Sequence, residues 1–180
     1  NGMVVEQFLH ALDPTMGDNG LPVPPLRCSD GGLLFLNDAS QNNASYFHLL
    51  KTDASGQVQW SKYYTDSLGT QFGGLRFALI EKDGSYFAFG SYHNVPINTG
   101  WDNFMLRVDV NGDVEQAWLF GDQAEASDVP RTFIHTNDNG LIMAEVLHPY
   151  ASVSVYYGIS VQRWDSGLNL LWSKQYDFGY

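Results

Sequence analysis

The chain of 180 residues is 44% hydrophobic, 14% aromatic and only 16% charged, which excludes an intrinsically disordered segment and is typical of a folded, strand-rich domain. Twenty acidic residues against nine basic ones give a net charge of −11, which disfavours binding to nucleic acid and other polyanions. No stretch approaches the roughly 18 consecutive apolar residues of a membrane span, so membrane insertion is not expected.

The first predicted element is a strand over residues 1–10, NGMVVEQFLH, whose alternation after Gly2 is that of the last strand of a repeat unit. Residues 11–25 contain four of the seven prolines and are predicted to form a surface connection, because proline removes backbone donors from a sheet. The chain thus starts within a unit, and we expect it to be a segment of a longer protein. Two copies that close a ring, or three sheets in an open arc, are the alternatives.

A short strand is predicted at residues 26–29, where Cys28 is expected to be a buried and inert thiol. Because Cys28 is the one cysteine, no intrachain disulfide can form. A tight turn follows at residues 30–32 and leads into an apolar run. The same turn recurs at residues 83–85 and 138–140, each time followed by an apolar run, so the sequence is repetitive.

A longer motif occurs three times, at residues 49–64, 105–120 and 161–176. Each copy has an apolar run, a polar turn and a second run in which side chains alternate, which predicts a β-hairpin. The copies align without gaps at a period of about 56 residues, near the blade lengths of β-propellers. Two kinds of structural repeat residue stand in register: the turn aspartates Asp53, Asp109 and Asp165, and the strand tryptophans Trp60 and Trp172.

Each unit contains four strand candidates, which in the middle unit are residues 76–81, 86–91, 104–109 and 114–120. A four-stranded meander cannot bury both of its faces alone, and neighbouring units around an axis supply the missing contacts. The predicted fold class is therefore all-β, a β-propeller-like array of about three four-stranded antiparallel blades plus one leading strand.

We expect a single repeat domain over residues 1–180. Its first part, 1–25, holds the last strand of a preceding unit and the proline-rich connection. The three blades are predicted at 26–66, 72–122 and 129–178.

These motifs resemble a known family, the secreted bacterial and archaeal β-propeller repeats of the type DGG…LiKtD..G.iqWsk, which are common in type IX-secreted surface proteins. The matching stretches are residues 30–34, 49–53, 56–62 and 171–176. The resemblance implies a propeller fold and an extracellular or cell-surface location, but no reaction. The middle copy departs from the pattern, with Gln116 in place of the tryptophan, so its outer face is expected to differ.

The turn of the middle hairpin is a candidate metal site. Asp109, Asn111 and Asp113 place oxygen atoms at alternate positions, a pattern that suits calcium. The alternative is an Asx turn, in which the first aspartate bonds to its own backbone. Ser55 and Gly167 break the ligand pattern in the other units, which favours the Asx turn and the absence of a cofactor.

Aromatic residues in or beside loops are the candidate ligand-binding residues: Tyr92, Trp101, Tyr150 and Tyr156. Packing between blades is the alternative role for these rings. The sequence has no nucleophile elbow, HExxH motif or phosphate-binding loop.

We therefore expect a non-catalytic extracellular binding or structural module that attaches protein or glycan. The alternatives are a glycan-processing enzyme with carboxylates near the propeller axis, and a structural subunit that self-associates through its edge strands.

Overall fold

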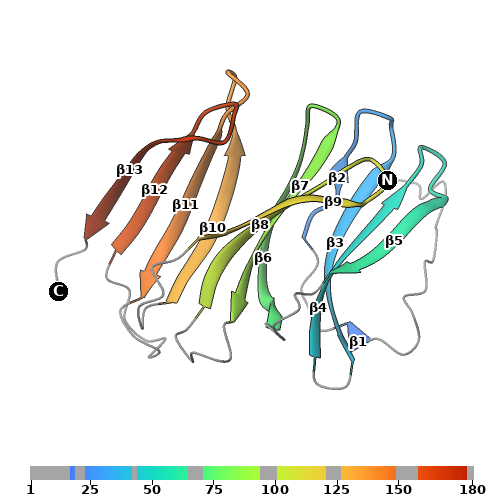
Figure 1. Cartoon of the computed structure of the whole chain (residues 1–180), viewed down its shortest axis with the longest axis horizontal. Coiled ribbons are helices and arrows are strands. Elements are labelled where there is room, and N and C mark those ends of the chain that lie inside the picture. Colours follow the sequence, from blue (N-terminus) through green and yellow to red (C-terminus); the bar gives the residue numbers. More distant parts are fainter. Residues whose placement is uncertain are drawn as a thin grey trace, which may run out of the picture.

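The computed structural model describes residues 17–18, 23–41, 44–64, 71–93, 101–120, 127–148 and 158–177. Every regular element in these ranges is a β-strand, and the strands form three sheets that lie side by side (Figure 1). No helix that could cross a membrane occurs in the described ranges. The predicted leading strand at 1–10 lies outside them.

The first sheet contains β1 to β5. β3, β4 and β5 form an antiparallel meander, and both short strands, β1 and β2, pair with β3. The bounds are Gly17–Asp18 for β1, Leu26–Arg27 for β2, Leu33–Gln41 for β3, Ala44–Thr52 for β4 and Val58–Tyr64 for β5. The prediction of a plain connection over 11–25 was incomplete, because Gly17 and Asp18 pair with Ser40 and Ala39.

The second and third sheets are four-stranded antiparallel meanders in sequence order. The second contains β6 (Gln71–Lys82), β7 (Ser85–His93), β8 (Trp101–Val108) and β9 (Val114–Phe120). The third contains β10 (Ser127–His135), β11 (Leu141–His148), β12 (Gly158–Trp164) and β13 (Leu170–Asp177). The all-β class and the three antiparallel sheets are confirmed, with four strands in the second and third sheets and, in the first, β1 in addition to the four strands β2 to β5. β6 begins earlier than the predicted residue 76, beyond shifts in pairing register between Phe72, Arg76 and Ala78.

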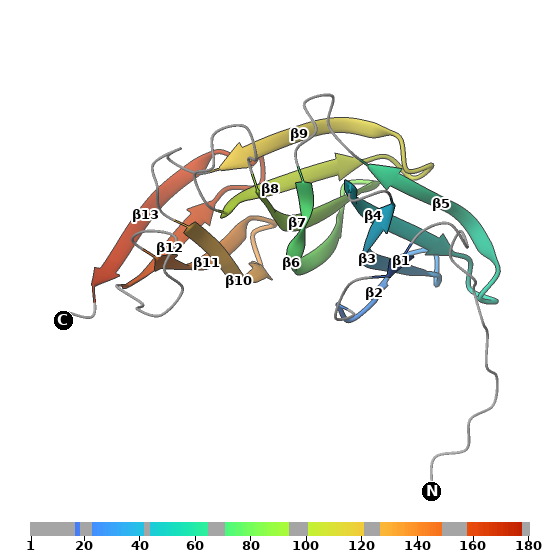
Figure 2. The same cartoon turned by 90° about the horizontal axis from the view of Figure 1, so that it is seen from below.

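The second sheet is buried on both faces. Tyr86 and Ala88 of β7 belong to a core cluster shared with the first sheet, whereas Phe87 and Phe89 belong to a cluster shared with the third sheet. This explains why β7 is a continuous apolar run rather than an alternating one. The sheets follow one another along an arc and do not close into a ring (Figure 2).

Candidate functional site

The β4–β5, β8–β9 and β12–β13 turns have one geometry, set by their first aspartate. In the β8–β9 turn, Asp109 Oδ1 accepts the backbone N–H groups of Asn111 and Asp113, each at 2.8 Å. Asp53 and Asp165 accept the equivalent N–H groups at 2.8–2.9 Å. The pKa of each carboxyl group is lowered, mainly by the side-chain hydrogen bond from Ser55 at Asp53 and from Asn169 at Asp165, and by the backbone N–H of Asp113 at Asp109; the other backbone bonds add to this. Each aspartate therefore holds its own hairpin turn.

The predicted calcium ligands Asp109, Asn111 and Asp113 all lie in the β8–β9 turn. Asp109 Oδ2 lies 3.2 Å from the side-chain amide nitrogen of Asn111, and Asp113 Oδ1 lies 2.6 Å from the Lys62 ammonium group. The carboxylates thus face N–H donors, as in the Asx turn. The described residues contain no group of three or more His, Cys, Asp or Glu placed to share a metal ion.

A cationic side chain stands two residues before the turn aspartate in each unit, and in the first unit it is buried. Lys51 has no exposed surface, and its ammonium group lies 2.6 Å from Asp30 Oδ2, 2.7 Å from the carbonyl oxygen of Thr52 and 3.2 Å from Gln59 Oε1. A Cβ atom on Gly32 would lie 2.7 Å from the Lys51 nitrogen. The glycine of the preceding turn leaves the space that the cation fills.

The third unit repeats this arrangement with arginine. Arg163 makes two bonds of 2.6 Å to the Asp138 carboxylate and donates to the backbone oxygens of Leu141 and Trp164. Gly140 occupies the place of Gly32, and a Cβ atom there would meet the guanidinium group. The bonds from Thr136 and Arg163 lower the pKa of Asp138 to about 2.

The middle unit has a serine in place of this glycine. Ser85 accepts a hydrogen bond from Arg107 Nη2 at 3.2 Å and donates one to Glu115 Oε2 at 2.7 Å. Arg107 Nε lies 2.7 Å from the same Glu115 oxygen. The Arg107 side chain thus binds Glu115 on β9, whereas Lys51 and Arg163 bind the aspartate of the turn that precedes the glycine.

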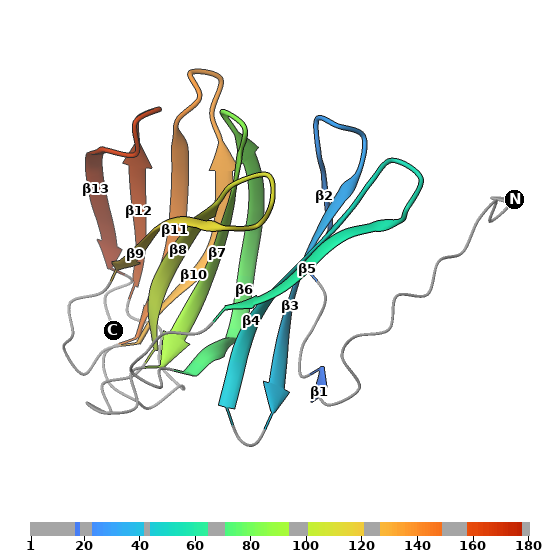
Figure 3. The same ribbon diagram turned by 45° about the vertical axis from the view of Figure 1, so that its right-hand side comes forward.

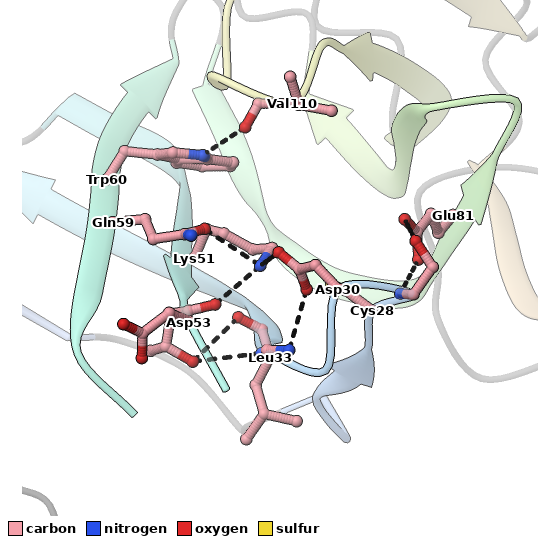
Figure 4. Close-up of polar contacts among 12 residues, drawn as sticks. Cys28, Asp30, Leu33, Lys51, Asp53, Gln59, Trp60, Glu81 and Val110 are labelled. Carbon is pink, nitrogen blue, oxygen red and sulfur yellow. Dashed lines mark hydrogen bonds and ion pairs between the residues drawn. The ribbon is translucent and has the colours of Figure 1, made fainter. Parts of the chain in front are cut away.

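The first interface, between the first and second sheets, is formed by the β5 side chains and the β8–β9 turn. The Trp60 indole N–H donates to the Val110 carbonyl oxygen at 2.8 Å (Figure 4). Gly112 has φ +77°, and a Cβ atom on it would lie 3.0 Å from the Trp60 ring. The tryptophan therefore requires the glycine opposite it.

Two further β5 residues contact the same turn. Lys62 forms an ion pair with Asp113 at 2.6 Å, and the Tyr64 hydroxyl donates to the Gly112 carbonyl oxygen at 2.8 Å. Burial raises the pKa of Tyr64, so its hydroxyl keeps the proton that it donates. Tryptophan, lysine and tyrosine at alternate positions of one strand thus hold one hairpin turn.

The second interface, between the second and third sheets, has different residues at these positions. Gln116 replaces the tryptophan and Trp118 replaces the lysine, while Leu168 replaces the glycine of the opposing turn. Trp118 and Leu168 pack against one apolar cluster. Lys82 donates to the Ser166 carbonyl oxygen of the same turn. Where the tryptophan is absent, the glycine is absent as well.

Glu145 is an enclosed carboxyl group in the second interface, 5% exposed. Its oxygens accept the side-chain amides of Asn103 on β8 and Gln162 on β12, both at 2.9 Å. Burial is the dominant influence and raises its pKa, although these bonds act in the opposite direction. No local pattern marks Glu145, because its partners come from other strands.

An open groove of about 560 Å³ runs along the first interface. Its walls combine aromatic rings with carboxylate and amide groups: Ser29, Asp30, Gln59, Trp60, Glu81, Gly84, Tyr86, Val110 and Asn111. The ring centroids of Trp60 and Tyr86 are 6.3 Å apart. Gln59 and Asn111 are exposed, so their amides are available to a ligand. This groove is the candidate functional site.

The two groove carboxylates are already bonded (Figure 4). Both Glu81 oxygens accept from Ser29, one from the backbone N–H and one from the hydroxyl, at 2.6 Å each. The hydrogen bond from Lys51 is the largest influence on Asp30 and lowers its pKa. Both groups therefore serve as acceptors held in fixed positions.

Two of the predicted ligand-binding aromatics lie at neighbouring strand ends. Tyr92 is the penultimate residue of β7 and Trp101 begins β8, where backbone pairing of Tyr92 with Asp102 and of His93 with Trp101 brings the two positions close together. Tyr150 and Tyr156 lie outside the described residues. Of the groove residues, the sequence marked only Trp60, as a structural repeat residue, and Asn111, as a candidate metal ligand. Glu81 and Tyr86 carry no signal in the sequence, since only the packing of two sheets brings them beside Trp60.

Comparison with protein-family models and with curated proteins found no match to this chain. The resemblance to secreted propeller repeats stays a prediction.

Proposed function

We propose that the chain is a non-catalytic extracellular binding module, built on a propeller-like repeat array, that holds a neutral glycan in the groove of the first interface. The repeated four-stranded units support the propeller-like arrangement, and the resemblance to secreted repeats supports the extracellular location. The composition of the groove carries the binding role.

The groove offers the groups that recognise sugars. The half-buried Trp60 ring can pack against a sugar ring, while Gln59 and Asn111 can donate to and accept from hydroxyl groups. Asp30 and Glu81 add fixed acceptors. The net charge of −11 opposes anionic glycans, so a neutral oligosaccharide fits the site best.

The state of the carboxyl groups favours binding over hydrolysis. A glycosidase needs one carboxylic acid with a raised pKa near the bond that it cleaves. In the groove, the pKa of Asp30 is lowered and Glu81 is bonded twice to Ser29. Glu145 has a raised pKa but is enclosed in the second interface, outside the groove.

A screen of neutral oligosaccharides, followed by calorimetry with the best ligand, tests this proposal on the full chain. Asn111→Ala removes a groove amide and is expected to weaken binding about tenfold. Ser55→Ala is the matched control, because Ser55 has the same position in the β4–β5 turn and lies outside the groove. Full affinity in Asn111→Ala, equal losses in both variants, or no binding by any neutral glycan would overturn the proposal.

A further inference from the structure

The outer face of the third sheet carries the same three side chains that hold the first interface. Trp172, Lys174 and Tyr176 alternate along β13 as Trp60, Lys62 and Tyr64 do along β5. The pairing register agrees as well. Trp172 pairs with Arg163 as Trp60 pairs with Lys51, and Tyr176 pairs with Ile159 as Tyr64 pairs with Phe47.

In the third sheet, this face is uncovered in the described structure. All of β13 is exposed, with Trp172 at 40% and Tyr176 at 49%. In the first sheet, the residues beneath the equivalent face, Leu36 and Leu49, are fully buried by the second sheet. β13 thus presents a complete set of interface side chains, and no turn of the described residues lies opposite them.

The β4–β5 turn, residues 53–57, has the geometry that such side chains bind. Its two backbone bonds, of 2.9 and 3.1 Å, match those of 2.9 and 3.0 Å in turn 109–113. Gly56 has φ +84° where Gly112 has +77°. The carbonyl oxygens of Ala54 and Gly56 therefore stand where those of Val110 and Gly112 accept from Trp60 and Tyr64. Figure 3 shows this turn at the free end of the first sheet, away from the other two.

The pairing of residues across the two existing interfaces selects this turn. In the first interface, Trp60 lies opposite Gly112. In the second interface, Gln116 replaces the tryptophan and Leu168 replaces the glycine. Leu168 has a φ of +62°, close to that of the glycine it replaces. The turn therefore keeps its shape with a side chain at this position, and that side chain would fill the place of the tryptophan ring. Among the described residues, the two end sheets carry the matching combination, with Trp172 on the third sheet and Gly56 on the first.

We infer that a second copy of this chain docks its turn 53–57 onto Trp172, Lys174 and Tyr176. The Trp172 indole donates to the Ala54 carbonyl oxygen and packs on Gly56, while the Tyr176 hydroxyl donates to the Gly56 carbonyl oxygen. Lys174 meets the Gln57 amide oxygen in place of a carboxylate. The contact is head-to-tail, so copies join into a ring or a chain. It does not depend on the proposed glycan groove.

Sedimentation velocity over a concentration series tests the inference on the full chain, at about 0.15 M salt to screen the repulsion between acidic copies. We expect the average mass to rise with concentration. Trp172→Gln and Gly56→Leu copy the residues of the second interface, and each is expected to weaken association about tenfold or more. Leu171→Ala is the control, because Leu171 is exposed on the opposite face of β13.

An equimolar mixture of the two variants distinguishes this contact from others. Trp172→Gln retains the turn and Gly56→Leu retains the β13 face, so the mixture is expected to form a dimer that neither variant forms alone. A wild-type chain that stays monomeric at every concentration would overturn the inference. Dissociation by Trp172→Gln with no effect of Gly56→Leu would also overturn it, since the β13 face would then pair with itself. Circular dichroism and thermal melts confirm that both variants are folded.

Discussion

At the scale of single residues, Glu145 is a carboxyl group that the fold keeps in an environment favouring its neutral form. Asn103 and Gln162 donate to its oxygens, but burial between two sheets outweighs these bonds and raises its pKa. The native state therefore holds the Glu145 proton to a higher pH than the unfolded chain does. Glu145 thus makes the free energy of unfolding depend on pH.

We predict that Glu145→Gln removes this dependence. Between the ordinary value of 4.5 and the raised native pKa, the native state binds more protons than the unfolded state, so stability falls as pH rises through that interval. A glutamine has no such titration. Its amide can donate to Asn103 Oδ1, which has no other partner in the described part of the chain, once the Asn103 amide turns over. The variant should gain stability relative to wild type with rising pH.

Urea unfolding from pH 4.5 to 8 measures this difference. Val114→Ala is the control, because Val114 is exposed and has no titratable group, so its difference from wild type should not change with pH. An equally flat difference for Glu145→Gln would contradict the prediction.

Gly32 must be a glycine because its surroundings leave no space for a side chain, and not because of its backbone conformation. A Cβ atom there would lie 2.7 Å from Lys51 Nζ and also meet the Thr52 carbonyl oxygen. We predict that Gly32→Ala lowers the free energy of unfolding by about 3 kcal/mol, because the backbone oxygen cannot move aside. At Gly84 a Cβ atom meets nothing within 4 Å, and its φ of +79° leaves a cost of about 1 kcal/mol for Gly84→Ala. Chemical denaturation compares the two, and equal costs would show that the close contacts at Gly32 add nothing beyond the cost seen at Gly84.

At the scale of elements, the hairpin turns have one internal geometry but different surroundings. Asp53 and Asp109 make the same pair of bonds to their own turns. Only the Asp109 turn also accepts hydrogen bonds from Trp60 and Tyr64. An identical substitution in the two turns therefore has different consequences for the fold.

We predict that Asp109→Ala lowers the midpoint of thermal unfolding more than Asp53→Ala does. Both variants lose the turn bonds, but Asp109→Ala also displaces the carbonyl oxygens that receive Trp60 and Tyr64. Melts at a low protein concentration isolate the monomer for this comparison. Equal shifts would mean that the first interface does not depend on the shape of its turn.

The strands and turns could be predicted from the sequence because their signals are local. Alternation in β5 and the aspartate of each turn are visible within a few residues. The start of β6 was missed because register shifts interrupt its alternation. β1 was missed because two residues among prolines carry no pattern of their own.

The groove and the interfaces could not be predicted in the same way, because their residues meet only across sheets. Glu81 bonds to Ser29 of the preceding sheet, and Glu145 bonds to Asn103 of the preceding sheet. Trp60 was predicted as a repeat residue, yet its dependence on Gly112 appears only in three dimensions. The departure at Gln116 was visible in the sequence, but its counterpart at Leu168 had no meaning until the sheets were placed side by side.

At the scale of the whole molecule, the order of the sheets is encoded by which residues face each other across an interface. In the first interface a tryptophan contacts a glycine. In the second interface a glutamine replaces the tryptophan and a leucine replaces the glycine. The space between sheets is filled in the first interface by the tryptophan ring against the turn glycine, and in the second by the leucine side chain within an apolar cluster. Replacing the tryptophan and the glycine together by glutamine and leucine should therefore cost less stability than the two single replacements added together.

A double-mutant cycle in the first interface tests this rule. Trp60→Gln loses the ring and its bond to Val110, and Gly112→Leu places a side chain against the ring, so each is expected to destabilise the chain by about 2 kcal/mol. In the double variant the leucine occupies the space of the lost ring. We predict a cost below the sum of the single costs by about 1–3 kcal/mol, measured by chemical denaturation.

The same substitutions at the uncovered ends supply the control within the chain. Trp172 and Gly56 lie at opposite ends of the array, so Trp172→Gln and Gly56→Leu should add in a monomer, with no coupling beyond about 0.5 kcal/mol. Coupling in the first interface together with additivity at the ends would show that direct contact, not the residue types alone, links tryptophan to glycine. Additive costs for Trp60 and Gly112 would contradict the rule, because the leucine would then have failed to enter the space that the ring leaves.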